Sequence, residues 1–238
     1  MTEDIDNRVS AILEDLKLDS TEKRKRSMSK YGVKAENVIG VSVVAIRKIA
    51  KKWNYKDKMS NHKLAKVLWE TNIHEARLLA TIIDEPSLVS DEQIEKWILD
   101  IQSWDLCDGL VMNLLWKTKF ATQKIHEWSK RPEEYLKRAS FALIAKQAVS
   151  DKKAPNDYFI RLLPIIRSAV QDSRNYVKKS VSWALRQIGK RNRALNKKII
   201  KYTSEFSENN NKTAKWISHD VLKELESSKV QKRISNKK

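Results

Sequence analysis

The sequence predicts an all-α protein made of stacked helical repeats. Only 4 Gly and 4 Pro occur among its 238 residues, whereas an all-β chain of this length would need many more turn residues. Apolar residues recur at spacings of three and four over most of the chain, as in helices with one buried face. Similar helical segments also recur along the sequence, which indicates repeats.

The first half of the chain contains six expected helices joined by short links. The first is predicted by its apolar face alone, and most of the others follow a serine or threonine that can cap a helix. Ser90 with Gln93 forms a capping box for the sixth. The expected helices cover residues 3–17, 22–30, 43–53, 62–70, 73–84 and 93–101, with Ser20 or Thr21, Ser42, Ser60 and Ser90 as caps.

The second half begins with a central helix that is expected over residues 104–117, after Ser103 as its N-cap. Pro132 suits the first position of a later helix, and Pro164 should kink or split another. The remaining expected helices cover residues 120–129, 132–149, 157–171, 174–188, 192–206 and 212–227.

The end of the chain has a different composition. Residues 229–238 contain five basic residues, no acid and no periodic apolar pattern. A segment of this kind cannot bury enough apolar surface to fold, so we expect a disordered basic tail. We expect the helices before it to form one helical repeat domain over residues 1–228.

Three of the expected helices look like copies of one unit. The segments 75–80, 136–143 and 177–185 each contain a basic residue followed by small and apolar residues at helical spacing. Arg138 and Lys179, in the second and third segments, lie 41 residues apart, within the period of about 40–47 residues of HEAT repeats. We therefore expect an ARM/HEAT-type solenoid of stacked helix pairs with a concave surface.

The charge of the chain favours a polyanionic partner. It carries 48 Lys and Arg against 30 Asp and Glu, a net charge of +18, and nucleic acid is the commonest partner of so basic a protein. An anionic membrane surface is the rival, but no apolar run approaches the ~20 residues of a spanning helix. The N-terminus lacks a signal peptide's apolar stretch, and the single cysteine suits a reducing cytoplasm.

The stretch from Ser103 to Asp108 is the first candidate site. Trp104 and Asp108 are four residues apart, so they share one face of the central helix and set a carboxylate beside an indole. Residue types alone favour a simpler interpretation, in which Asp108 is an acid favoured by the helix dipole and Trp104 belongs to the core.

The helix at 174–188 carries the second candidate. Trp183 lies off its apolar stripe, on the side of Lys179, Arg186 and Lys190. An indole among cations could stack on a nucleotide or pack against the neighbouring repeat, and the sequence leaves both open. The following stretch has no acid and suggests phosphate contacts; its basic residues are Arg186, Lys190, Arg191, Arg193, Lys197, Lys198 and Lys201.

The other candidate site residues give weaker indications of function. Small residues follow Arg138 at helical spacing and would leave room beside it, although periodicity alone favours an ordinary surface arginine. Cys107 is expected to be a small buried apolar residue. The histidines are scattered and no HExxH or CxxC motif is present, so no metal site is indicated.

Several of these residues together resemble a known family. Trp104, Asp105 and Asp108 resemble the W-D-x-x-D element of the AlkD-type bacterial DNA glycosylases, also called the DNA alkylation repair family. Arg138 and Trp183 lie in stretches that resemble two further elements, and the segments around Gly32 and Gly40 resemble the family's N-terminal region. The likeness covers roughly residues 10 to 226.

The resemblance implies a HEAT-like solenoid whose concave basic face grips duplex DNA. It also implies a glycosylase that releases cationic N3- or N7-alkylated purines without extruding the base into a pocket. Carried onto this chain, Trp104, Trp183 and Asp108 lie against the lesion's sugar, and Arg138 contacts the backbone. The other DNA-contact candidates are Lys179, Arg186, Lys190, Arg191 and Arg193. No metal or cofactor is implied, and we expect a monomer in the bacterial cytoplasm, associated with the nucleoid.

Three functions remain open at this point. The leading one is an alkylpurine DNA glycosylase. The second is a non-enzymatic solenoid that binds branched or distorted DNA, for which the basic stretch 186–201 would suffice. The third is a protein-binding scaffold, which would require an acidic partner for the surface of this +18 chain.

Overall fold

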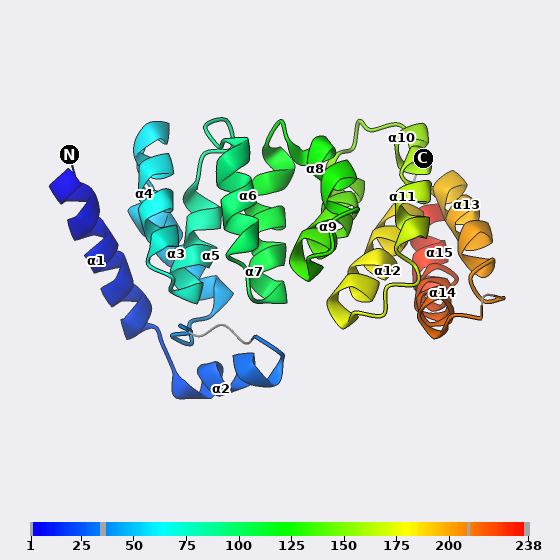
Figure 1. The fold of residues 1–238 in the computed structure, drawn as a ribbon, viewed down its shortest axis with the longest axis horizontal. Helices are drawn as coiled ribbons and strands as arrows, with labels where there is room; N and C mark the ends of the chain where they lie inside the picture. Colours follow the sequence, from blue (N-terminus) through cyan, green and yellow to red (C-terminus); the bar gives the residue numbers. More distant parts are fainter. Residues whose placement is uncertain (1, 34–36, 209, 236–238) are drawn as a thin grey trace. The chain divides into compact units, whose positions relative to one another are not determined.

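The computed structural model describes residues 2–33, 37–208 and 210–235, and every regular element in these ranges is a helix (Figure 1). Backbone contacts divide the chain into two compact units, Met1–Phe120 and Ala121–Lys238. That both belong to one repeat domain stays a prediction. None of the described helices is both long enough and apolar enough to cross a membrane.

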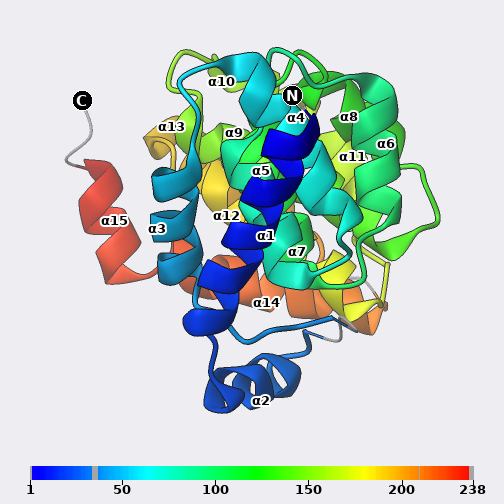
Figure 2. The same ribbon diagram turned by 90° about the vertical axis from the view of Figure 1, so that its left-hand side faces the viewer.

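The first unit is built on the row α3, α5 and α7, in which α5 packs against both of the others. Helix α4 also packs against α5, and α1 packs on α3 and α4 (Figure 2). The helices are α1 (Thr2–Leu18), α2 (Glu22–Lys30), α3 (Val43–Trp53), α4 (Lys58–Glu70), α5 (His74–Ile83), α6 (Asp91–Leu99) and α7 (Trp104–Gly109).

Capping side chains set most of these boundaries. The Ser42 hydroxyl accepts a hydrogen bond from the backbone of α3, and Ser90 does the same for α6. Helix α4 begins earlier than expected because Asp57, rather than Ser60, caps it. The Gln93 side chain donates to Asp84 at 2.7 Å, so the predicted capping box is only half formed.

A buried carboxylate fixes the loop between α2 and α3. Glu75, fully buried at the start of α5, accepts backbone hydrogen bonds from Ile39, Gly40 and Val41 at 2.9, 2.7 and 3.2 Å. Gly40 has a φ of +99°, and a Cβ there would lie 2.7 Å from the Thr21 carbonyl oxygen. Only glycine fits this close approach without strain.

The second unit repeats the pattern with the row α9, α12 and α14. Pro164 splits the segment expected at 157–171 into two short helices, as predicted. Pro132 lies just before α9 rather than inside it. The helices are α8 (Ala121–Trp128), α9 (Glu134–Ser150), α10 (Asn156–Arg161), α11 (Leu163–Ser168), α12 (Asn175–Gly189), α13 (Arg193–Ser204) and α14 (Lys212–Leu225).

The prediction of a disordered tail over residues 229–238 was wrong for residues 229–235. Ser228–Ser235 forms a helix, α15, that packs on α14. Val230 and Ile234 are four residues apart and both buried, so the segment has an apolar face that we did not recognise. The side-chain amide of Gln231 also donates from Nε2 to the Leu225 carbonyl at 2.6 Å. Residues 236–238 of the expected tail lie outside the described residues.

Hydrogen bonds between neighbouring helices of the second unit recur at one sequence separation. Arg138 donates to the Tyr176 carbonyl, Ser182 to Asp220 and Arg186 to Glu224, and each pair is 38 residues apart. Helices α9, α12 and α14 therefore occupy equivalent positions in successive repeats, with a period close to that of HEAT repeats.

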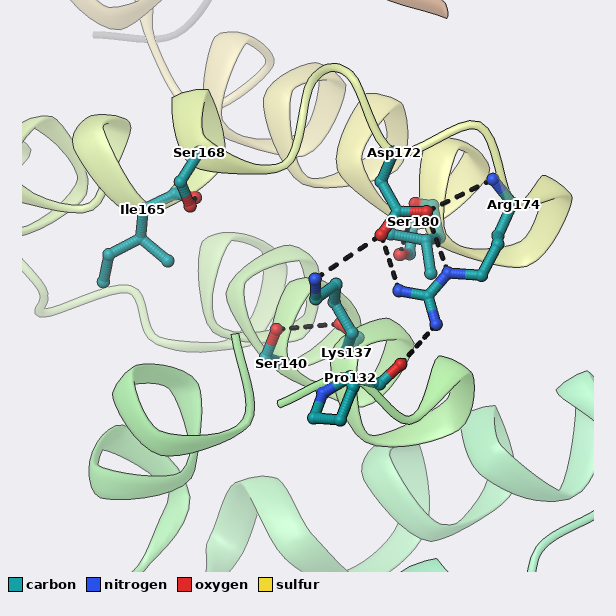
Figure 3. Close-up of polar contacts among 9 residues, drawn as sticks. Pro132, Lys137, Ser140, Ile165, Ser168, Asp172, Arg174 and Ser180 are labelled. Atoms are coloured by element: carbon teal, nitrogen blue, oxygen red, sulfur yellow. Dashed lines mark hydrogen bonds and ion pairs between the residues drawn. The ribbon is translucent and has the colours of Figure 1, made fainter. Parts of the chain in front are cut away.

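An acidic residue ahead of α12 ties this helix to α9 (Figure 3). Asp172 accepts from Arg174 Nε and Nη2 at 2.9 and 2.6 Å, and Lys137 Nζ on α9 lies 3.5 Å from the same carboxylate. Arg174 also donates to the carbonyl of Pro132. Hydrogen bonds from Arg174 hold the pKa of Asp172 below its usual value, although burial opposes them.

This network predicts a local stability defect. We expect Asp172→Ala to lower the free energy of unfolding by about 2 kcal/mol, because Arg174 loses its hydrogen-bond acceptor and Lys137 loses its ion-pair partner in a partly buried site. Asp157→Ala, at an exposed position of α10, is the matched control and should change it by less than about 0.5 kcal/mol. Urea denaturation measures both, and equal effects would contradict the assignment.

Candidate nucleic-acid interface

Trp104 and Asp108 lie on α7, as predicted, and both side chains are half-buried. The Trp104 indole donates from Nε1 to the Tyr31 carbonyl at 3.0 Å, which ties α7 to the end of α2. The ring is thus fixed through its edge. Ser103 occupies the N-cap position, but its side chain makes no capping hydrogen bond.

The backbone after Asp108 departs from the continuous helix that we expected. Leu110–Leu114 is π-helical, and a 3₁₀ turn, Leu115–Lys117, follows it. Short π-helical segments within helices are often found at functional sites. Gly109 allows α5 to approach, since a Cβ there would lie 2.4 Å from Leu78 Cδ1. The Asp108 end of α7 is therefore closely packed against α5.

Asp105 has a partner that the sequence did not reveal. The Nε2 of His74 lies 2.9 Å from Asp105 Oδ2, and the His74 side chain is only 1% exposed. Burial alone would raise the pKa of Asp105, but the hydrogen bond from His74 and its charge lower it below the usual value. Asp105 therefore links α7 to α5. The sequence alone could not distinguish this structural role of Asp105 from the catalytic role expected of Asp108.

Trp183 lies on α12, half-buried beside a fully buried stripe. With the oxygen of the Gln187 amide facing it, Trp183 Nε1 donates to that oxygen at 3.1 Å. This position off the core stripe agrees with the prediction. The buried stripe contains Val177, Val181, Ala184 and Ile188.

Arg138, by contrast, is an inner residue of the second unit. It is 6% exposed, its Nη1 donates to the Tyr176 carbonyl at 2.9 Å, and its Cζ lies 6.0 Å from the centre of the Tyr176 ring. The small residues that follow it, Ala142 and Ala145, are buried. Arg138 is therefore largely shielded from solvent, with Nη1 of its guanidinium bound within the protein.

The basic stretch that begins at Arg186 contains residues of two kinds. The sequence showed no acid within it, but α14 supplies acids: Arg186 lies 2.7 Å and Lys190 2.5 Å from Glu224. Arg191 donates to the carbonyls of Ala148, Asp151 and Ala154. The residues of the stretch with exposed side chains are Arg193, Lys197, Lys198 and Lys201.

The predicted site residues thus form two groups. Trp104 and Asp108 belong to the first unit, whereas Arg138, Lys179 and Trp183 belong to the second. Lys179 is exposed on α12. That the two groups meet around one lesion, on a concave basic face, stays a prediction. Within the described residues, no cluster of three or more metal-ligating side chains is found.

Comparison with known proteins defines the family. The sequence profile described as DNA alkylation repair enzyme matches residues 12–225. The chain belongs to the DNA alkylation repair enzyme family. The family resemblance seen in the sequence is therefore confirmed. A comparison with curated proteins gave no significant match.

A solved structure confirms the HEAT-like repeat fold of this DNA alkylation repair protein. It matches with a TM-score of 0.76 and 20% sequence identity, over 94% of this chain and 95% of the other. That structure is described as a new family of proteins related to the HEAT-like repeat DNA glycosylases, with affinity for branched DNA structures.

The His74–Asp105 pair predicts a pH-dependent stability difference. A carboxylate with a lowered pKa stabilises the fold above its unfolded pKa of about 3.9, and this contribution is lost as the pH falls through the folded value. We expect Asp105→Asn to lower the free energy of unfolding by about 1–2 kcal/mol at pH 7. The difference should narrow below about pH 4. Urea denaturation across this range measures it, and a constant difference would contradict the assignment.

Proposed function

We propose that this protein is a DNA glycosylase that hydrolyses the N-glycosidic bond of cationic N3- or N7-alkylated purines in duplex DNA, acting as a monomer. The observation that carries the proposal is the pairing of Trp104 and Asp108 on α7 in a chain of the DNA alkylation repair family. The fixed indole edge at Trp104 supports it, because a preorganised ring need not be ordered when DNA binds.

The chemistry fits these side chains. An alkylated purine that already carries a positive charge leaves readily without a general acid, so the species to be stabilised is an oxocarbenium-like sugar. Asp108 would stabilise that cation and orient the attacking water. Trp104 and Trp183 would each contribute a cation–π contact of about 0.5–2 kcal/mol. The water replaces the purine at C1′ and leaves an abasic site, and this step requires no cofactor.

The second unit would supply one set of phosphate contacts. Lys179 and Arg193 are exposed and available to the backbone of the DNA. Arg186, Lys190 and Arg191 already bind groups of the protein, so they would exchange these partners for phosphates or act through the field of their charge. Arg138 would contact the backbone near the lesion after release from Tyr176.

Release of 7-methylguanine from methylated duplex DNA tests the proposal. We expect Asp108→Asn to reduce the single-turnover rate at least about 100-fold, since a stabilising negative charge at the transition state is removed. Binding to the same duplex should persist. Asp157→Asn, the same change on the exposed surface of α10, is the control and should retain the wild-type rate. Excision by Asp108→Asn at the wild-type rate would overturn the mechanism.

A second function is favoured by a specific observation, which is the similar structure described as having affinity for branched DNA. In that case the wild type would release no base and would bind a four-way junction at least about tenfold more tightly than a linear duplex of equal length. Equal affinity for the two DNAs would count against this alternative.

A further inference from the structure

Helix α2 carries the most concentrated unpaired positive charge that we find in the first unit. Five of its nine residues are basic, and none of the nine is buried. Within the described part of the chain, no ion pair reaches any of these five side chains, in contrast to Arg186 and Lys190 in the second unit. The five are Lys23, Arg24, Lys25, Arg26 and Lys30.

Three of these cations form one outward stripe. The face of α2 that carries Lys25 and Met28 looks toward the loop at Gly40, since a Cβ at Gly40 would lie 3.1 Å from Lys25 Cβ and Met28 is half-buried. The opposite face carries Lys23, Arg26 and Lys30, spaced three and four residues apart. We call these three residues the α2 stripe, and it extends for about 10 Å.

The helix is held at both ends, although Figures 1 and 2 show it standing off the other helices of the first unit. At its start, the Thr21 amide donates to the Gly40 carbonyl at 3.1 Å, and Gly40 in turn donates to the carboxylate of Glu75. At its end, the Tyr31 carbonyl accepts from Trp104. These anchors preorganise the stripe for binding and place it next to a residue of the proposed reaction centre.

We propose that the α2 stripe binds the phosphate backbone of duplex DNA beside Trp104. The inference rests on DNA being the partner, as in the proposed function, but it does not require excision. Phosphates fit because the five basic residues of α2 outnumber its one acid, Glu22, which leaves the nine-residue helix with a net charge of +4. A lipid surface fits less well, because Met28 is the only large apolar residue of α2 and lies on the inner face.

The salt dependence of binding to unmodified duplex DNA tests this assignment. The variant Lys23→Gln/Arg26→Gln/Lys30→Gln should reduce the magnitude of the negative slope of log K against log salt concentration by about 2.7, or 0.9 for each lost phosphate contact. The single change Arg26→Gln should lower it by about 0.9. The control is Lys56→Gln/Lys63→Gln/Lys66→Gln, which removes the same charge from exposed positions in the same unit.

The outcomes separate this inference from the glycosylase proposal. A decrease in slope magnitude for the α2 variant and a much smaller one for the control would support the stripe whether or not any base is released. Equal decreases in slope magnitude for the two variants would reveal a general charge effect and overturn the stripe assignment. An unchanged slope for the α2 variant would also overturn it, and lost binding of that variant to phosphatidylserine vesicles would then point to a lipid surface. Absence of duplex binding by the wild type would overturn the DNA-binding basis of both proposals.

Discussion

Two adjacent side chains at the start of α5 hold the candidate site of the first unit together. His74 engages Asp105 on α7, and Glu75 collects three backbone amides from the loop that follows α2. Buried donors and acceptors without partners are costly, so each contact fixes its segment strongly. Since Trp104 also binds the Tyr31 carbonyl, α2, α5 and α7 form a closed set of contacts around the indole.

This arrangement separates two uses of positive charge in a chain of net charge +18. In the second unit, Arg186 and Lys190 bind acids of α14, and Arg138 binds the carbonyl of Tyr176, so these cations join successive repeats. The basic side chains of α2 do not join helices in this way, and they remain exposed. The same residue types therefore serve packing in one place and suit phosphate binding in another, and burial distinguishes the two uses.

Much of the fold could be predicted because helical periodicity, caps and prolines are local signals. Ser42, Ser90 and Pro164 act as expected, and the family elements around Trp104 and Trp183 lie on helices as predicted. What could not be predicted depends on partners distant in sequence, such as His74 for Asp105. The basic stretch from Arg186 looked unpaired because its acids lie 34 to 38 residues later. The helix α15 was missed because a single apolar pair, Val230 and Ile234, is enough to dock so short a segment.

Glu75 holds the α2 segment in position beside Trp104. Amide hydrogen exchange in wild type and in the Glu75→Ala variant, which removes both acceptor oxygens, tests this anchoring directly. We expect the amides of Gly40 and Val41 to be strongly protected in the wild type and to lose at least about tenfold protection in the variant, while amides of α9 in the second unit stay unchanged. Equal protection of Gly40 and Val41 in the two proteins would contradict the account.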